Sequence, residues 1–138
     1  MSVGFTVKYY WYQIGTGDFL HSFFSTIAYN LEDGKWGSKY PVIMNELYSG
    51  DLKSNRIELA IEELDLIVPE LRKLKPNKVV WDIEDLTKQP PWGDNISSEI
   101  TDLSNYYVTS DGADFITILR HALEKGIKIH ADVKIENI

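Results

Sequence analysis

The stretch GFTVKYYWYQIGTGDFLHSFFSTIAYNL, residues 4–31, decides what kind of fold this chain adopts. Its first part, Gly4 to Gly15, is rich in valine, threonine and aromatic residues of alternating character, which predicts a β-strand with one buried face. A Gly-Thr-Gly triplet interrupts that pattern. Apolar residues then recur at helical spacing up to Leu31, so a helix capped by Asp18 is expected, ending near Gly34. A strand followed directly by a helix indicates a fold that combines both.

Two more helices are expected further along the chain. From Ile57 to Leu74, apolar residues repeat at intervals of three and four, which is the most regular amphipathic pattern in the sequence. A capping box between Asn55 and Glu58 is expected to start this helix. The last helix is expected from Ala113 to Lys125 and to end at Gly126, because glycine readily adopts the conformation that closes a helix.

Three further segments have the composition of strands: residues 78–83, 106–109 and 127–135. Residues 42–48 fit either a short strand or one or two helical turns. The sequence therefore predicts an α+β (or α/β) fold in one domain, residues 1–138, with about four strands in a sheet packed by about three main helices. The order of the elements leaves open whether the sheet is mixed or antiparallel.

Length and composition narrow the class of protein. A chain of 138 residues and 15.9 kDa has room for one domain, and 43% hydrophobic and 25% charged residues are ordinary for a folded protein. The absence of cysteine excludes a disulfide scaffold, a thiolate metal site and a cysteine nucleophile. No apolar stretch is long enough for a membrane span and no secretory signal opens the sequence, so a cytoplasmic location is expected. A net charge of −7 argues against nucleic-acid binding.

The negative charge is concentrated in one third of the chain. Between Asp82 and Asp114, eight acidic residues oppose Lys88 alone, whereas the rest of the chain holds thirteen residues of each sign. One interpretation is an anionic surface that meets a basic partner, with aromatic residues as anchors. The other is charge that only keeps the protein in solution, with Asp111 and Asp114 serving as helix caps. The candidate partner-binding residues are Asp82, Glu84, Asp85, Trp92, Asp94, Glu99 and Asp102.

A second candidate surface is the segment from Trp36 to Tyr48. Trp36 and Tyr40 lie in a glycine-containing stretch that is expected to be a loop. Large aromatic side chains exposed on a loop are costly unless a partner covers them.

Catalytic signatures are weak. Asp82 and Glu84, on one face of the expected strand 78–83, could ligate Mg²⁺ in a metal-dependent hydrolase, with help from His130. Lys88 is the only nearby cation, however, and a strand-end turn with solvated acids explains the pattern better. The sequence contains neither a serine-hydrolase elbow nor a phosphate-binding glycine loop. We therefore expect a protein that is not an enzyme and that carries no catalytic residues, no metal and no cofactor.

The order of several short blocks resembles one known family. The blocks are Gly17-Asp18-Phe19 with Phe24-Ser25-Thr26-Ile27, Tyr40 to Gly50, Val80-Trp81-Asp82 followed by Pro90-Pro91-Trp92-Gly93, and Tyr107 to Gly112. Together they are similar to the immunity protein 70 type of bacterial polymorphic toxin systems, and the likeness extends from about Gly4 to Ile129.

The resemblance implies a small cytoplasmic protein that binds the toxin domain of its own strain or of attacking kin and blocks it without catalysis. In such systems the toxin domain is frequently a nuclease with a basic substrate-binding surface, so an acidic inhibitor would act as a plug or a substrate mimic. The family supplies no catalytic residues and does not say which surface meets the toxin. A generic cytoplasmic adaptor for another basic protein remains an alternative reading.

Overall fold

The opening segment forms a β-hairpin rather than the single strand that its composition predicts. In the computed structural model, which describes residues 2–137, β1 (Val3–Val7) and β2 (Tyr10–Gly15) pair in antiparallel fashion. Lys8 and Tyr9 form the connection, and Lys8 adopts a left-handed backbone conformation with φ of 58°. Glycine or asparagine usually marks such a turn in a sequence. Neither residue is present at Lys8-Tyr9, so the sequence gives no sign that the chain reverses direction there.

The sheet has four antiparallel strands in the order β2-β1-β4-β3. β4 (Val133–Asn137) lies beside β1, and the two-residue β3 (Asp51–Leu52) extends the sheet at its far edge. The expected class and number of strands are confirmed, but not the identity of the strands. Residues 78–83 form no strand, and in the 106–109 segment only Val108 makes an isolated bridge, to Asp114.

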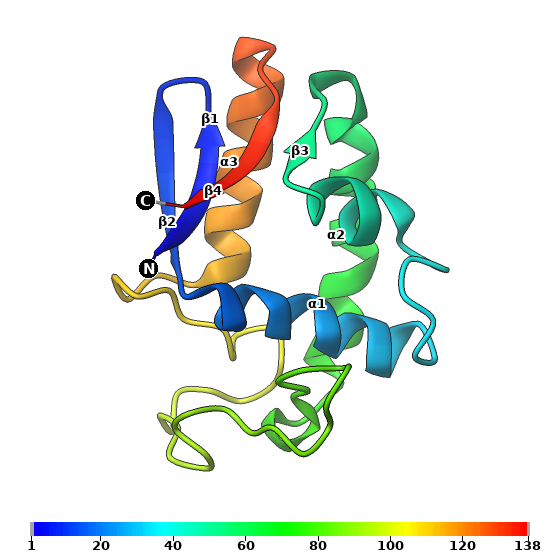
Figure 1. Cartoon of the computed structure of the whole chain (residues 1–138), viewed down its shortest axis with the longest axis vertical. Coiled ribbons are helices and arrows are strands. Elements are labelled where there is room, and N and C mark those ends of the chain that lie inside the picture. Colours follow the sequence, from blue (N-terminus) through cyan, green and yellow to red (C-terminus); the bar gives the residue numbers. More distant parts are fainter. Residues whose placement is uncertain (1, 138) are drawn as a thin grey trace.

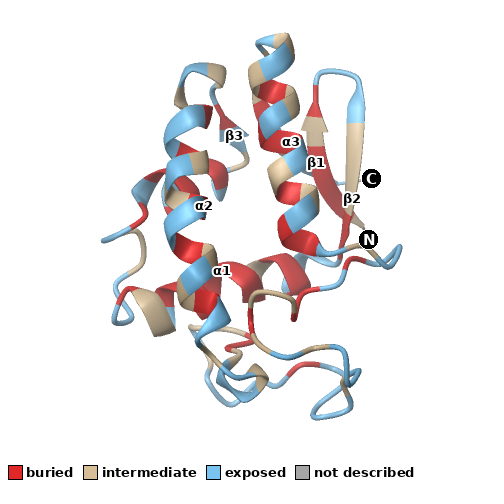
Figure 2. Ribbon diagram, turned by 180° about the vertical axis from the view of Figure 1, so that it is seen from behind, coloured by how far each residue is buried: buried red, intermediate tan, exposed pale blue. Residues whose placement is uncertain are grey.

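Three main helices accompany this sheet. α1 (Gly17–Leu31) crosses below its lower end, α3 (Phe115–Ile129) covers one face, and α2 (Ile57–Arg72) stands beside them (Figure 1). α1 and α3 contact the strands of the sheet, and α2 packs on the other two helices. Buried residues face the space between these elements (Figure 2). Within the described residues, no helix is both long enough and apolar enough to cross a membrane.

The helix ends differ from those expected. Thr16 rather than Asp18 caps α1, because its hydroxyl accepts a hydrogen bond of 3.1 Å from the backbone N–H of Phe19. The 3₁₀ turn η2 (Ser54–Arg56) leads into α2 in place of the predicted capping box. α2 contains Pro69 near its C-terminal end. Two short helical segments complete the chain. The π-helix η1 (Val42–Leu47) lies in the stretch that fitted either a strand or helical turns, and the 3₁₀ turn η3 (Pro76–Lys78) was not predicted.

α3 does not stop at Gly126. It continues to Ile129 and ends with His130 in a left-handed conformation, so the predicted strand 127–135 is wrong for its first six residues. The glycine serves close packing instead of termination. A Cβ at position 126 would lie 2.5 Å from Ile57 Cδ1 and 2.9 Å from the carbonyl oxygen of Ala131.

The chain between η3 and α3 is irregular but well anchored. Beneath α1, the hydroxyl of Tyr107 lies 2.7 Å from that of Thr26 and 3.0 Å from that of Ser22. The same Ser22 hydroxyl donates to the carbonyl oxygen of Val80, and the Val80 N–H donates to Thr26. Two buried polar residues of α1 thus replace the ladder of hydrogen bonds that a strand would have supplied.

Candidate partner-binding surface

All seven candidate residues lie in the acidic segment, defined as residues 82–114, which forms loops at the foot of the molecule below α1 (Figure 1). Of the six carboxylates among them, those of Glu84, Asp94 and Glu99 are exposed and, within residues 2–137, make no hydrogen bond or ion pair. Asp85 and Asp102 instead accept hydrogen bonds from neighbours in their own turns. The seven residues therefore fall into a group that shapes the loops and a group that is available to a partner.

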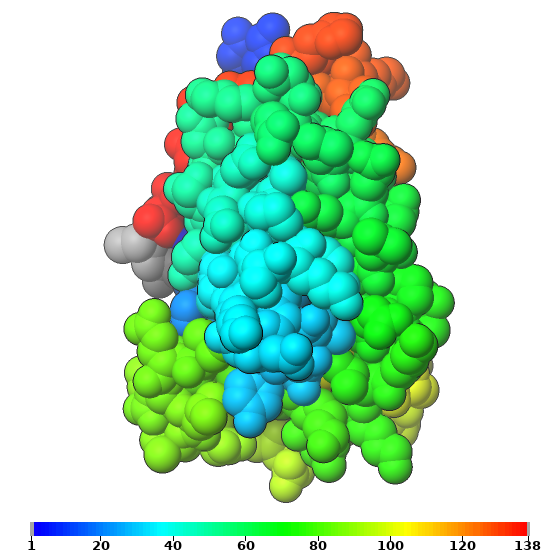
Figure 3. All heavy atoms as spheres, turned by 90° about the vertical axis from the view of Figure 1, so that its right-hand side faces the viewer, coloured from blue at the N-terminus to red at the C-terminus, as the bar shows by residue number. Residues whose placement is uncertain are grey.

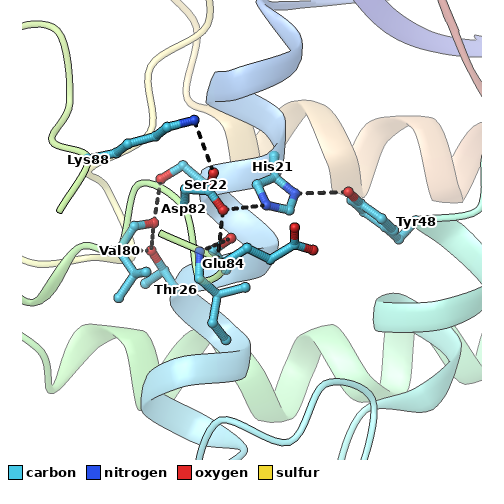
Figure 4. Close-up of polar contacts among 10 residues, drawn as sticks. His21, Ser22, Thr26, Tyr48, Val80, Asp82, Glu84 and Lys88 are labelled. Atoms are coloured by element: carbon cyan, nitrogen blue, oxygen red, sulfur yellow. Dashed lines mark hydrogen bonds and ion pairs between the residues drawn. The ribbon is translucent and has the colours of Figure 1, made fainter. Parts of the chain in front are cut away.

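Asp82 belongs to the group that shapes the loops. Its Oδ1 accepts a 2.9 Å hydrogen bond from the backbone N–H of Glu84 and lies 3.3 Å from His21 Nε2, while its Oδ2 lies 3.5 Å from Lys88 Nζ (Figure 4). The backbone hydrogen bond, followed by His21 and Lys88, holds the pKa of Asp82 below its usual value. This carboxylate therefore stays ionised at neutral pH.

His21 joins the acidic segment to the second candidate surface. Its Nδ1 lies 2.8 Å from the hydroxyl of Tyr48 (Figure 4), and its ring stacks on Trp36 with centroids 5.9 Å apart. Burial raises the pKa of the Tyr48 hydroxyl, and the negative charges of Glu84 and Asp82 raise it further. On the face seen in Figure 3, the cyan atoms of the loop after α1 and the yellow-green atoms of the acidic segment adjoin each other. The acidic segment and the Trp36 to Tyr48 segment, which are separate candidates in the sequence, therefore lie next to each other in the fold.

The loop that carries Trp36 is held in place by two carboxylates, Glu32 and Glu63, which were not among the residues predicted from the sequence. Glu32 is buried and accepts hydrogen bonds of 2.9 Å from the backbone N–H groups of Gly37, Lys39 and Tyr40. An acidic residue just before the Asp33-Gly34 turn was the available signal, because a loop leaves several N–H groups in need of an acceptor.

Glu63 of α2 holds the start of η1. Its carboxylate accepts hydrogen bonds of 3.1 Å and 2.7 Å from the N–H groups of Val42 and Ile43. Burial raises the pKa of Glu63, and these two hydrogen bonds oppose that effect. Trp36 in turn donates its indole N–H to the carbonyl oxygen of Met44 at 2.7 Å. The aromatic cluster of Trp36, Tyr48 and His21 is therefore fixed in place by the scaffold.

Trp92 occupies a similarly fixed position in the acidic segment. Its indole N–H donates to the hydroxyl of Tyr106 at 2.8 Å, and its ring meets Trp81 edge-to-face with centroids 5.4 Å apart. The side chain still leaves 37% of its surface exposed. An exposed aromatic ring with a fixed orientation is the kind of group that anchors protein interfaces.

The hydrolase alternative loses its geometric basis. Asp82 and Glu84 stand in a turn, not on one face of a strand, and His130 ends α3 at the opposite end of the molecule from the acidic segment (Figure 1). Within residues 2–137, no three His, Asp or Glu side chains come together in a way that could hold a metal ion.

Comparison with known proteins supports one assignment. No curated protein and no solved structure matches the chain. The sequence model described as Immunity protein 70 matches residues 5–135, nearly the entire chain, in agreement with the resemblance noted in the sequence. The chain belongs to the Immunity protein 70 family.

Proposed function

We propose that this protein acts in the cytoplasm by binding a cognate toxin domain, a nuclease, through the acidic segment and blocking it by direct contact without catalysis. Membership of an immunity protein family supports the immunity role and the existence of a toxin partner. The observation that carries the choice of surface is the exposure of Glu84, Asp94 and Glu99, whose carboxylates have no partner among residues 2–137. A basic toxin surface would supply one.

The anchoring of the acidic segment supports the same proposal. Binding costs free energy when loops must become ordered, and a preorganised surface avoids that cost. Here buried hydrogen bonds join Ser22 and Thr26 of α1 to Tyr107 of the segment and to Val80 just before it, so the segment is anchored before any partner arrives. We therefore expect association without a folding step.

The first experiment is co-expression with the toxin domain encoded beside this chain, scored by survival of the host and by co-purification. Rescue together with a stable complex is the expected result. If the toxin still kills and no complex forms, the proposal is wrong, and the alternative of an adaptor for another basic protein becomes the better explanation.

The second experiment tests the choice of surface. The triple variant Glu84→Lys, Asp94→Lys, Glu99→Lys is expected to bind the toxin domain at least tenfold more weakly at low salt, measured by calorimetry. The control Glu58→Lys, Glu62→Lys, Glu124→Lys makes the same change in charge on exposed positions of α2 and α3. Equal weakening in both variants would show that only net charge matters and that the acidic segment has no special role.

A further inference from the structure

The acidic segment contains an apolar hollow of about 300 Å³ among its charged residues. We call it the Trp92 groove. Its apolar lining consists of Phe19, Trp92, Ile96, Ile100, Tyr106 and Val108. Trp92 and Val108 are the exposed members, with 37% and 46% of their surfaces open to solvent. An exposed hollow of this kind is costly in water and marks a place where a partner binds.

The walls of the groove are rigid because they continue into the core. Tyr106 packs edge-to-face on the buried Tyr107, with ring centroids 5.1 Å apart, and Tyr107 in turn contacts Phe19 at 5.5 Å. The hydrogen bond from Trp92 to Tyr106 fixes the outer wall. A partner side chain entering the groove would therefore meet a preformed surface, as in the centres of tight interfaces.

Acidic residues lie beside this apolar site. Asp18 precedes Phe19 in the chain and Glu99 precedes Ile100, and both acids are exposed. Asp94 lines the adjoining hollow, which shares Ile96 and Tyr106 with the groove. Burial raises the pKa of the Tyr106 hydroxyl and the charge of Asp94 adds to this effect, as expected for a carboxylate close to the groove.

We infer that the Trp92 groove receives a large apolar side chain that the toxin domain presents between lysine or arginine residues. The apolar lining fits the side chain, and the neighbouring acids Asp18, Asp94 and Glu99 fit its basic flanks. The groove lies at the lower limit of the roughly 300–1,000 Å³ that small-molecule pockets span, and such a volume suits one or two side chains. This inference rests on the proposed function and assigns the centre of its interface.

The test separates apolar contact from charge. Val108→Glu places a carboxylate in the groove and makes the segment more acidic, so attraction by charge alone predicts unchanged or tighter binding. The groove predicts at least tenfold weaker binding of the purified toxin domain, mainly through faster dissociation, in stopped-flow and calorimetric measurements. The control is Leu66→Glu, at a leucine of α2 that is 63% exposed.

A second variant keeps the inference testable if Val108→Glu fails to fold. Asn95 is exposed at the rim of the groove, and Asn95→Trp is expected to fill it and to weaken binding to a similar degree without any change of charge. Binding as tight as that of the parent protein in a folded groove variant would overturn the inference and leave the proposed function intact. If the parent protein itself does not bind the toxin domain, the proposed function is wrong.

Discussion

Glu32 shows how a single residue decides the position of a loop. Its carboxylate is buried, with 3% of the residue exposed, and it accepts three backbone hydrogen bonds from the loop that carries Trp36. In the sequence, only its place just before the Asp33-Gly34 turn sets Glu32 apart from the other acids of this chain. The role depends on where the loop returns, which is a property of the folded molecule.

Replacement of Glu32 by alanine is expected to destabilise the protein by about 2–4 kcal/mol, because buried N–H groups would lose a charged acceptor. Urea denaturation measures this change. Glu62→Ala, at an exposed position of α2, is the control and is expected to cost less than about 0.5 kcal/mol. A similar small cost for Glu32 would mean that the loop does not depend on this carboxylate.

Asp82 gives a prediction about pH. Its folded-state pKa lies below the unfolded value, so its contribution to stability is present above about pH 4 and is lost as the pH falls through the folded pKa. Asp82→Asn is therefore expected to be less stable than the parent protein at pH 7, with a difference that shrinks below about pH 4. Thermal melts between pH 3 and pH 7 measure it. A difference that is independent of pH would contradict the assignment.

At the scale of elements, the sequence was most informative where a long apolar period was present. The three main helices were predicted because each repeats an apolar face over fifteen or sixteen residues. The segment around Val80 is equally rich in β-forming residues, but it is buried by α1 and bonded to Ser22 and Thr26. A short apolar run therefore predicts burial and does not by itself predict a strand.

The candidate surface was predictable only in part for the same reason. The concentration of acids was visible in the sequence, whereas the meeting of His21, Trp36 and Tyr48 with Asp82 joins positions from three separate segments. The π-helical turn η1, which carries the chain to Tyr48, has no recognised sequence pattern of its own.

Gly126 provides the test of helix packing. Alanine is the better helix former by about 1 kcal/mol, so a glycine that only terminated or weakened α3 would be improved by Gly126→Ala. The structure predicts the opposite, a loss of about 1–3 kcal/mol, because the new methyl group would collide with Ile57 and with the backbone of Ala131. Chemical denaturation decides between these outcomes, with Lys128→Ala as the control at an exposed position of α3. A gain in stability would show that α2 and α3 are less closely packed.

At the scale of the whole molecule, the distribution of charge matters more than its total. The acidic segment accounts for the entire net charge of −7, and it lies at one end of the structure. A molecule charged at one end is expected to be oriented by a basic partner before contact, which raises the rate of productive encounter.

The expected result is an association rate with the toxin domain that falls at least tenfold between about 10 mM and 150 mM salt, while the dissociation rate changes little. Stopped-flow fluorescence of the tryptophans follows both rates. The triple lysine variant of the acidic segment is expected to lose most of this salt dependence. An association rate that does not respond to salt would mean that charge does not guide the encounter.

The pairing of β1 with β4 has a consequence for how the protein is made. The hydroxyl of Thr6 in β1 donates a hydrogen bond to the carboxylate of Glu136 in β4, a residue that lies 130 positions later in the chain. Ribosomes add about 5–20 residues per second, so β1 waits roughly 6–26 s for its second neighbour to be synthesised. The sheet is completed only after β4 has been synthesised.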